Sequence, residues 1–394
     1  MNASEPDSSS PYVREFILQG FSCEWKIQVL LFSLFMTTYT LTVTGNGAIV
    51  CAVLCDQRLR TPMYIFLGNF SFLEIWYVSS TGPKMLINFL SEKKTISFAG
   101  CFLQFYFFFS LGGSECFLLT AMAFDRYLAI CRPLHYPNIM TKNFCSKLVI
   151  TSWICGFVLF VTPIALMSQM PFCGPYVIDH IVCDPGPLFA LICSSAPRTQ
   201  LLCYTLSSLV IFGNISVILS SYALVLIAVL HMPSATGRHK AFSTCGFHLA
   251  VVSLFYGSLM VMYVSPSLGH SAGMQKVATL FYAMVTPLFN PLIYSLRNKE
   301  IKAALRKIYM FPSSKISRSL KPATEASNKA VPRMEKPLFS AVLPPSLLAL
   351  MSHDLVSWAW TAPDCTVADS SLLANLSYYI LGLRTAPFRI LLQC

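Results

Sequence analysis

Two acidic side chains, Glu74 and Glu115, interrupt segments of the chain that are otherwise apolar and long enough to cross a membrane. A carboxyl group at membrane depth is costly, so acids in such positions usually serve a function. Two acids that lie near each other either share a proton, and are then only hydrogen-bonded, or hold a cation. The chemistry that this pair predicts is therefore the binding of a proton or of a cation.

A second charged pair, Asp125 and Arg126, stands at the end of the third apolar segment. Adjacent charges at a membrane boundary can simply reflect side chains that extend toward water. At the end of a long span, however, such an ion pair can hold a helix bundle closed. In the last apolar segment Pro291 removes a helix hydrogen bond, and we expect Asn290 to bridge the freed carbonyl groups.

Catalytic patterns are absent from the sequence. It contains no nucleophile–base arrangement, no Gly-rich phosphate loop and no spacing typical of a metal site, so we do not expect an enzyme. His248 has no partner at metal-ligand spacing, and we expect it to be a core or interfacial histidine with a satisfied ring.

The composition indicates which elements position these groups. Of 394 residues, 55% are hydrophobic and 11% are charged, whereas a soluble domain carries about 25% charged residues. A mean hydropathy of +0.60 excludes a soluble globular protein and a disordered one. The net charge of +11 comes from basic residues spread between apolar runs, which argues against nucleic acid as a partner.

Segments without charge locate the membrane spans, because a helix needs about 20 apolar residues to cross the bilayer. Seven segments meet this length: five have no Asp, Glu, Lys or Arg and two have one carboxylate each, and in chain order they are 27–55, 61–83, 95–124, 148–178, 199–237, 241–275 and 277–296. Backbone groups in lipid must bond within their own segment, so these spans are helices. The predicted fold class is an all-α membrane protein, a bundle of seven transmembrane helices.

Lys and Arg are concentrated in the loops that follow the first, third, fifth and seventh spans. By the positive-inside rule these loops are cytoplasmic, so the N-terminus is outside and the C-terminus is cytoplasmic. The sequon at Asn2 is then on the correct side for glycosylation. We expect a multi-pass protein of the plasma membrane, with the bilayer as a partner.

Four cysteines are expected on the outer, oxidising side, where disulfides persist: Cys101, Cys173, Cys183 and Cys193. Four cysteines allow three pairings, and the residues alone do not choose among them.

Several motifs in order resemble one family. The motifs are Leu59-Arg60-Thr61-Pro62-Met63-Tyr64, Met122-Ala123-Phe124-Asp125-Arg126-Tyr127, Ser221-Tyr222, Lys240-Ala241-Phe242-Ser243-Thr244-Cys245 and Asn290-Pro291-Leu292-Ile293-Tyr294. With them the chain resembles rhodopsin-like G-protein-coupled receptors and, more narrowly, odorant (olfactory) receptors, from about residue 12 to about residue 310. Glu74 departs from the family, which usually has Asp at that place.

The resemblance implies roles for particular residues. It pairs Cys101 with Cys183 and Cys173 with Cys193. The residues implied as the G-protein switch are Asp125, Arg126, Tyr127, Tyr222, Lys240, Asn290, Pro291 and Tyr294. The receptor architecture also implies a sodium site formed by Asn46, Glu74, Glu115 and Asn290; the alternative is that both acids are protonated. No other metal and no cofactor is expected.

The resemblance further implies an odorant receptor that binds small, mostly apolar, neutral volatiles and raises cyclic AMP through a stimulatory G protein. The residues expected to line the ligand cavity are Phe108, Phe109, Gly112, Leu206, Ser207, Val210, Tyr256, Leu259, Tyr263, Thr279 and Leu280. None of these is charged. The alternatives are the same receptor class with a non-olfactory chemosensory ligand and, from another class, a channel or transporter. The sequence does not identify the odorant or the oligomeric state.

The chain divides into four parts by this interpretation. Residues 1–25 form an extracellular N-terminus, 26–296 the receptor domain, and 297–311 an amphipathic eighth helix on the membrane surface. Residues 312–394 continue beyond the family's usual end. We expect this tail to be mostly disordered and to be an addition by splicing or a change of reading frame, rather than a regulatory tail; its effect on surface export is open.

Overall fold

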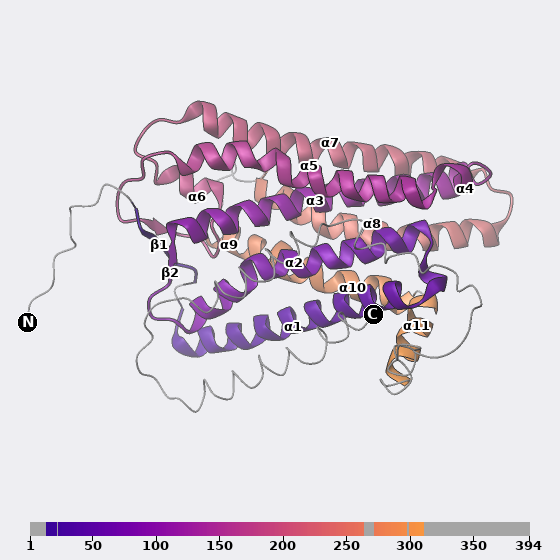
Figure 1. Ribbon diagram of the computed structural model, residues 1–394, viewed down its shortest axis with the longest axis horizontal. Coiled ribbons are helices and arrows are strands. Elements are labelled where there is room, and N and C mark those ends of the chain that lie inside the picture. The colour runs from indigo at the N-terminus through magenta and orange to yellow at the C-terminus, as the bar shows by residue number, and fades with distance from the viewer. Residues whose placement is uncertain (1–12, 22, 264–271, 298, 311–394) are drawn as a thin grey trace, which may run out of the picture.

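The computed structural model describes residues 13–21, 23–263, 272–297 and 299–310 (Figure 1). Within this part the chain forms a bundle of seven helical spans. The first six are α1 (Trp25–Cys55), α2 (Pro62–Leu90), α3 (Phe98–Cys131), α5 (Lys142–Ser168), α7 (Pro197–Leu230) and α8 (Ala235–Tyr263). The seventh span consists of α9 (Ala272–Leu280), a π-helical turn η3 (Phe281–Val285) and α10 (Thr286–Arg297). Asn2 and the tail from residue 312 lie outside the described residues.

The lengths and compositions of the helices agree with a membrane protein. α1, α3, α5 and α7 are long and apolar enough to cross a bilayer by these criteria alone. The boundary between the last two spans differs from the expectation, because the predicted seventh span begins after Lys276, whereas α9 already includes it. One cation near a helix end can reach the interface, so a charge does not mark the end of a span.

Helix α3 occupies the centre of the bundle, where it contacts α2, α5, α7 and α8 (Figure 1). The approach of α5 to α3 depends on a glycine. A Cβ atom at Gly156 would lie 2.6 Å from the carbonyl oxygen of Ser110 and 2.6 Å from the backbone nitrogen of Ser114. Because these atoms belong to the α3 backbone, they cannot move aside. The two helices therefore meet backbone to backbone at this point.

A small sheet lies at the outer end of the bundle, in addition to the expected helices. Its strands are β1 (Glu15–Leu18), β2 (Thr95–Ser97) and β3 (Val177–Ile178), in the order β2-β1-β3. The central strand β1 is antiparallel to β2 and parallel to β3. Phe16 and Leu18 are fully buried while their neighbours in β1 are exposed, which is the alternation of a half-buried strand. Because β1 has only four residues, its alternating pattern is too short to be recognised in a sequence that otherwise predicts helices.

The outer loop after α5 begins earlier than the charge-free segment suggests. The helix ends at Ser168, and the chain continues through Pro171 and through Gly174, which has φ +89°, to β3 and the short helix α6 (Pro185–Ala190). The charge-free segment 148–178 therefore contains the end of an apolar helix and also the start of an apolar loop. Pro and positive-φ Gly are the residues that stop the helix.

The inner end carries the short elements η1 (Gln57–Leu59) and α4 (Tyr136–Ile139) and the eighth helix, α11 (Lys299–Met310). Ile301 and Ala304 of α11 are buried in a cluster that includes Leu59 and Tyr64, while Lys302 is exposed. The Tyr64 hydroxyl donates a 2.6 Å hydrogen bond to Oε2 of Glu300. One face of α11 therefore packs on the bundle, as an amphipathic surface helix does.

Candidate functional site

A small cavity of about 50 Å³ lies inside the bundle. Six of the seven spans contribute to its wall, and α5 contributes one phenylalanine. The lining residues are Tyr77, Phe108, Phe109, Gly112, Gly113, Cys116, Phe160, Ser207, Val210, Ile211, Phe255, Leu259 and Tyr282. This volume is below the range of about 300–1,000 Å³ that is typical of small-molecule sites, so a ligand has to be small and the cavity has to widen around it.

Aromatic rings form one wall of the cavity. The ring of Phe108 stacks on that of Tyr77 with centroids 5.1 Å apart, and it lies 5.5 Å from the ring of Tyr282. The ring of Phe109 meets that of Phe160 edge-on at 5.8 Å. Offset and edge-to-face rings at these distances attract one another beyond the burial of their area. The wall thus joins α2, α3, α5 and η3 through direct ring contacts.

The cavity is apolar and carries no charge. None of its lining residues is Asp, Glu, Lys, Arg or His; Ser207, Tyr77 and Tyr282 contribute hydroxyl-bearing side chains. A charged ligand would lose its hydration here without gaining a counter-ion, at a cost of several kcal/mol. The arrangement suits a neutral molecule with few polar atoms.

The structure brings together six of the eleven residues expected to line the cavity: Phe108, Phe109, Gly112, Ser207, Val210 and Leu259. Four others lie outside the lining. Leu206 is half-buried on α7 and Leu280 is buried elsewhere on the seventh span. Tyr256 packs on Phe255 at 5.2 Å, and the hydroxyl of Thr279 faces a loop histidine. The side chain of Tyr263 is outside the described residues.

Seven lining residues were not expected from the sequence: Tyr77, Gly113, Cys116, Phe160, Ile211, Phe255 and Tyr282. Gly113 and Cys116 follow Phe108 and Phe109 at helical spacing, so continuing that face of α3 by one turn would have found them. Tyr77 and Phe160 carried no such signal. Which face of α2 or α5 points inward depends on how the helices pack.

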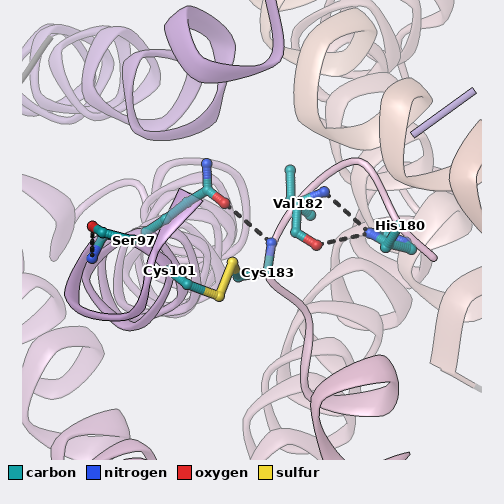
Figure 2. Close-up of a disulfide and its surroundings, with 7 residues drawn as sticks. Ser97, Cys101, His180, Val182 and Cys183 are labelled. Atoms are coloured by element: carbon teal, nitrogen blue, oxygen red, sulfur yellow. Dashed lines mark hydrogen bonds between the residues drawn. A yellow bond between two sulfur atoms is a disulfide. The ribbon is translucent and has the colours of Figure 1, made fainter. Parts of the chain in front are cut away.

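The outer loop after α5 is linked covalently to α3 (Figure 2). A disulfide joins Cys101 on α3 to Cys183 in the loop, with Cα atoms 5.5 Å apart. Next to it, the backbone N–H of Cys183 donates a 3.1 Å hydrogen bond to Oε1 of Gln104. A second disulfide joins Cys173 to Cys193. These are the two pairings that the family resemblance implied.

The buried acids of α2 and α3 lie close together in the middle of the bundle. Glu74 and Glu115 are 0% and 1% exposed, and their carboxyl groups are within hydrogen-bonding reach of each other. Nδ2 of Asn290 donates to Oε1 of Glu74. Four buried acceptor oxygens have no partner: Oδ1 of Asn46, Oε2 of Glu74, Oε1 of Glu115 and Oδ1 of Asn290. Orphaned buried acceptors of this kind match a cation or a proton.

Asn46, rather than Asn290, satisfies the backbone group that Pro291 frees. A proline at 291 cannot donate to the carbonyl oxygen of Pro287, and Nδ2 of Asn46 on α1 donates to that oxygen at 3.3 Å. The expectation that Asn290 bridges freed carbonyls is therefore wrong. The Asn290 amide nitrogen donates instead to Oε1 of Glu74. Among the described residues no three His, Cys, Asp or Glu side chains gather as a metal-ligand set.

At the inner end of α3, Asp125 and Arg126 form an ion pair with each other. Nε of Arg126 donates to Oδ2 of Asp125 at 3.0 Å, and the hydroxyl of Tyr136 donates to Oδ1 at 2.8 Å. Burial raises the pKa of Tyr136, so its hydroxyl keeps its proton and acts as the donor.

Two more of the expected switch residues have described side chains near this pair. Tyr222 is buried, and its hydroxyl lies 2.7 Å from Nδ1 of His248. Nε2 of the same buried ring has no partner, so the histidine is satisfied at one nitrogen and not, as expected, at both. Tyr127 is half-buried, with its ring 6.4 Å from that of Phe124. The side chains of Lys240 and Tyr294 lie outside the described residues.

The fold and these sites define a class of protein, the seven-helix receptors of the rhodopsin type. The structure of squid rhodopsin superposes on this chain with a TM-score of 0.61 and covers 81% of this chain and 94% of the rhodopsin chain. The two sequences are 17% identical, so this likeness concerns the fold alone.

Sequence comparisons narrow the class to a family. A family model described as "Olfactory receptor" matches residues 35–311. Human Olfactory receptor 11H12 is 78% identical over 308 residues, which are 78% of this chain and 94% of that protein. Human Olfactory receptor 11H6 is 65% identical over 297 residues, 75% of this chain and 90% of that protein. The chain belongs to the olfactory receptor family. It is a multi-pass membrane receptor and not an enzyme.

Proposed function

We propose that this chain is an odorant receptor of the plasma membrane that binds small, mostly apolar, neutral volatiles in the cavity between its helices and activates a stimulatory G protein, raising cyclic AMP. The observation that carries the ligand class is the composition of the cavity wall, which is aromatic and aliphatic and has no charged side chain. Family membership supports the coupling to a G protein.

The size of the cavity limits the ligand and its affinity. The small volume of the cavity favours a small ligand, and each heavy atom of a volatile with about 10–15 such atoms contributes at most about 1.5 kcal/mol, with less in practice. Much of that is offset by the loss of translational and rotational freedom on binding. We therefore expect responses in the micromolar range to neutral alcohols, aldehydes, ketones and esters.

The inner end supplies the coupling in this proposal. While Arg126 is held by Asp125, the inner ends of the helices stay together; its release on activation opens a cleft for a helix of the G protein. Arg126 is 13% exposed in its side chain, so this release uncovers a buried cation. The exposed cation can then contact the partner.

The test is cyclic AMP measured against an odorant panel in cells that display the full chain at a known surface level. We expect neutral volatiles to raise cyclic AMP, and charged amines or dicarboxylates to have no effect. Arg126→Ala at equal surface level should abolish the response. Activation by charged compounds alone would contradict the cavity assignment, and an odorant-evoked current without a G protein would favour a channel.

We further propose that a sodium ion binds among Asn46, Glu74, Glu115 and Asn290. The four unpaired acceptor oxygens support this site, because hard cations take oxygen ligands. When bound, the ion supplies a positive charge that holds two carboxylates together. Purified receptor should melt at a higher temperature in sodium chloride than in choline chloride at equal ionic strength. Glu115→Gln should abolish this difference, and equal melting of the unmodified chain in both salts would favour a shared proton instead.

A further inference from the structure

One buried ammonium group joins three segments that are far apart in the chain. Lys276 lies on α9, near the outer end of the seventh span, and its side chain is 10% exposed. Its Nζ forms an ion pair with Oδ1 of Asp179 in the outer loop. The same Nζ donates a 2.7 Å hydrogen bond to the carbonyl oxygen of Gly20, just after β1. The N-terminal segment, the outer loop and the seventh span therefore meet at this one side chain.

The first two of these segments form a single body through their backbones. The N–H of Ile17 donates to the carbonyl oxygen of Tyr176 at 2.9 Å, that of Gln19 to Ile178 at 3.0 Å, and that of Gly20 to His180 at 3.2 Å. Residues 15–20 and 176–184 are thus held by a ladder of hydrogen bonds, and we refer to them together as the outer lid. Moving one strand of this lid moves the other.

The two sides of the outer lid are attached to the bundle by different kinds of bond. On the α3 side it is fixed by the Cys101–Cys183 disulfide, by the Gln104 hydrogen bond and by the pairing of β1 with β2, the strand that leads into α3 (Figure 2). On the side of the seventh span the attachments that the structure describes are the Lys276 contacts and a 3.3 Å contact between Thr279 Oγ1 and Nε2 of His180. A covalent bond stays closed on the timescale of ligand exchange, whereas hydrogen bonds and ion pairs open and close rapidly.

The releasable side is also linked along the seventh span to a wall of the cavity. Lys276 and Thr279 are three residues apart on α9 and therefore neighbours on the helix surface, and Tyr282 follows in the π-helical turn η3. Tyr282 lines the cavity, and the other two hold the outer lid above it. Opening of the Lys276 contacts thus frees the edge of the outer lid on the side of Tyr282.

We propose that Lys276 is the latch of a hinged lid: the outer lid turns about the Cys101–Cys183 disulfide, and the opening of the Lys276 contacts sets the rate at which ligands enter and leave the cavity. This inference rests on the proposed function of the cavity as the odorant site. Asp179 is 52% exposed in its side chain, so water competes for its carboxylate and makes opening accessible. The latch controls exchange rate, and the ligand contacts are unchanged.

The latch is tested first without any odorant, by hydrogen exchange of the purified full chain in nanodiscs. The amides of Leu18 and Cys183 report closure of the outer lid, because each donates to an acceptor outside it, the carbonyl oxygen of Lys94 and Oε1 of Gln104. The ladder amides of Ile17, Gln19 and Gly20 donate within the lid and stay bonded when it turns as one body. Lys276→Met keeps the length of the side chain and removes the cation, and it leaves no buried carboxylate because Asp179 is half-exposed. We expect the amides of Leu18 and Cys183 to exchange about tenfold faster, which corresponds to about 1.4 kcal/mol. Lys276→Arg should retain most of the protection.

Lys93→Met is the matched control, since Lys93 is exposed on the same outer face. Asp179→Asn is a second variant that alters the exposed partner and spares the helix. Unchanged exchange of the Leu18 and Cys183 amides in both Lys276→Met and Asp179→Asn would overturn the latch, whether or not the cavity binds odorants.

The second measurement is the decay of the cyclic AMP response after odorant washout, at matched surface levels. We expect faster decay in Lys276→Met than in the unmodified chain and in Lys93→Met. Faster amide exchange with unchanged onset and decay would overturn the role of the lid in ligand exchange. If no volatile activates the unmodified chain, the proposed function fails, while the exchange data still decide whether the Lys276 contacts close the lid.

Discussion

The hydroxyl of Tyr136 donates a 2.8 Å hydrogen bond to Oδ1 of Asp125, and Arg126 binds the other oxygen of the same carboxylate. Tyr136 belongs to the short helix α4 in the loop after α3, whereas Asp125 is on α3 itself and is 1% exposed. The loop is thus connected to the ion pair that is expected to act as the switch. A change in the position of this loop alters how firmly Asp125 holds Arg126.

Removing this hydroxyl should raise basal signalling. Tyr136→Phe leaves a buried carboxylate with one donor fewer, and a hydrogen bond to a charged group contributes about 1.5–3 kcal/mol. If the bond belongs to the resting conformation, its loss shifts the population toward the active one by part of that amount. We expect cyclic AMP without odorant to rise several-fold at equal surface level. Tyr176→Phe, on the outer face, is the control, and equal basal signals in both variants would contradict this role.

Packing of α5 on α3 should fail when Gly156 gains a side chain. A Cβ atom at this position would lie 2.6 Å from two backbone atoms of α3, far inside contact distance. Overpacking of this kind costs about 1–3 kcal/mol, and more where backbone has to move. Gly156→Ala should therefore reduce surface display and lower the melting temperature. Gly213→Ala on α7 has nothing within 4 Å of its Cβ position and should behave like the unmodified chain. Equal display of the two variants would count against the close approach.

The face of α3 that points into the cavity could be predicted from the sequence, and the opposing faces could not. Spacing along one helix identifies Phe108, Phe109 and Gly112 as neighbours, because that is a property of the helix alone. Tyr77 and Phe160 enter the cavity only through the rotation of α2 and α5, which long-range packing determines. The donor to the freed carbonyl of Pro287 could not be predicted for the same reason. The sequence suggests Asn290, but only the packed bundle shows that Asn46 is the amide that reaches this carbonyl.

The outer lid should become less stable in acid because of His180. Burial lowers the pKa of His180 below its usual value near 6.5, with Asp184 and Asp179 opposing this shift and Lys276 adding to it. Below pH 6.5 the unfolded chain binds a proton that the folded chain does not, so stability falls as the pH falls, by at most about 1.4 kcal/mol per pH unit.

Melting temperatures between pH 7.5 and 5.5 measure this contribution. The unmodified chain should lose more stability over this range than His180→Gln, which has no titrating ring. Asp184 works in the opposite sense, since burial raises its pKa and stability then falls as the pH rises through the range above 3.8. Asp184 is present in both chains, but His180 also lowers the Asp184 pKa, so the difference between the chains reports the His180 ring together with its effect on Asp184. Parallel pH profiles of the two chains would show that His180 is not the group responsible.

Ser207 is the cavity residue best suited to test whether the receptor recognises a ligand by a hydrogen bond or by its shape alone. It lines the cavity from α7, and its hydroxyl is small enough that Ser207→Ala changes little volume. If the hydroxyl donates to a ligand oxygen, the variant should weaken alcohols and ketones by about 0.5–1.5 kcal/mol, or roughly 2- to 12-fold in the half-maximal concentration. A hydrocarbon of the same shape has no oxygen to lose a partner, so its weaker response should not change. Ser208→Ala is the control, because Ser208 is exposed on the outside of α7. An equal loss for the ketone and its hydrocarbon analogue would mean that position 207 affects the shape of the cavity and does not bind the polar end of the odorant.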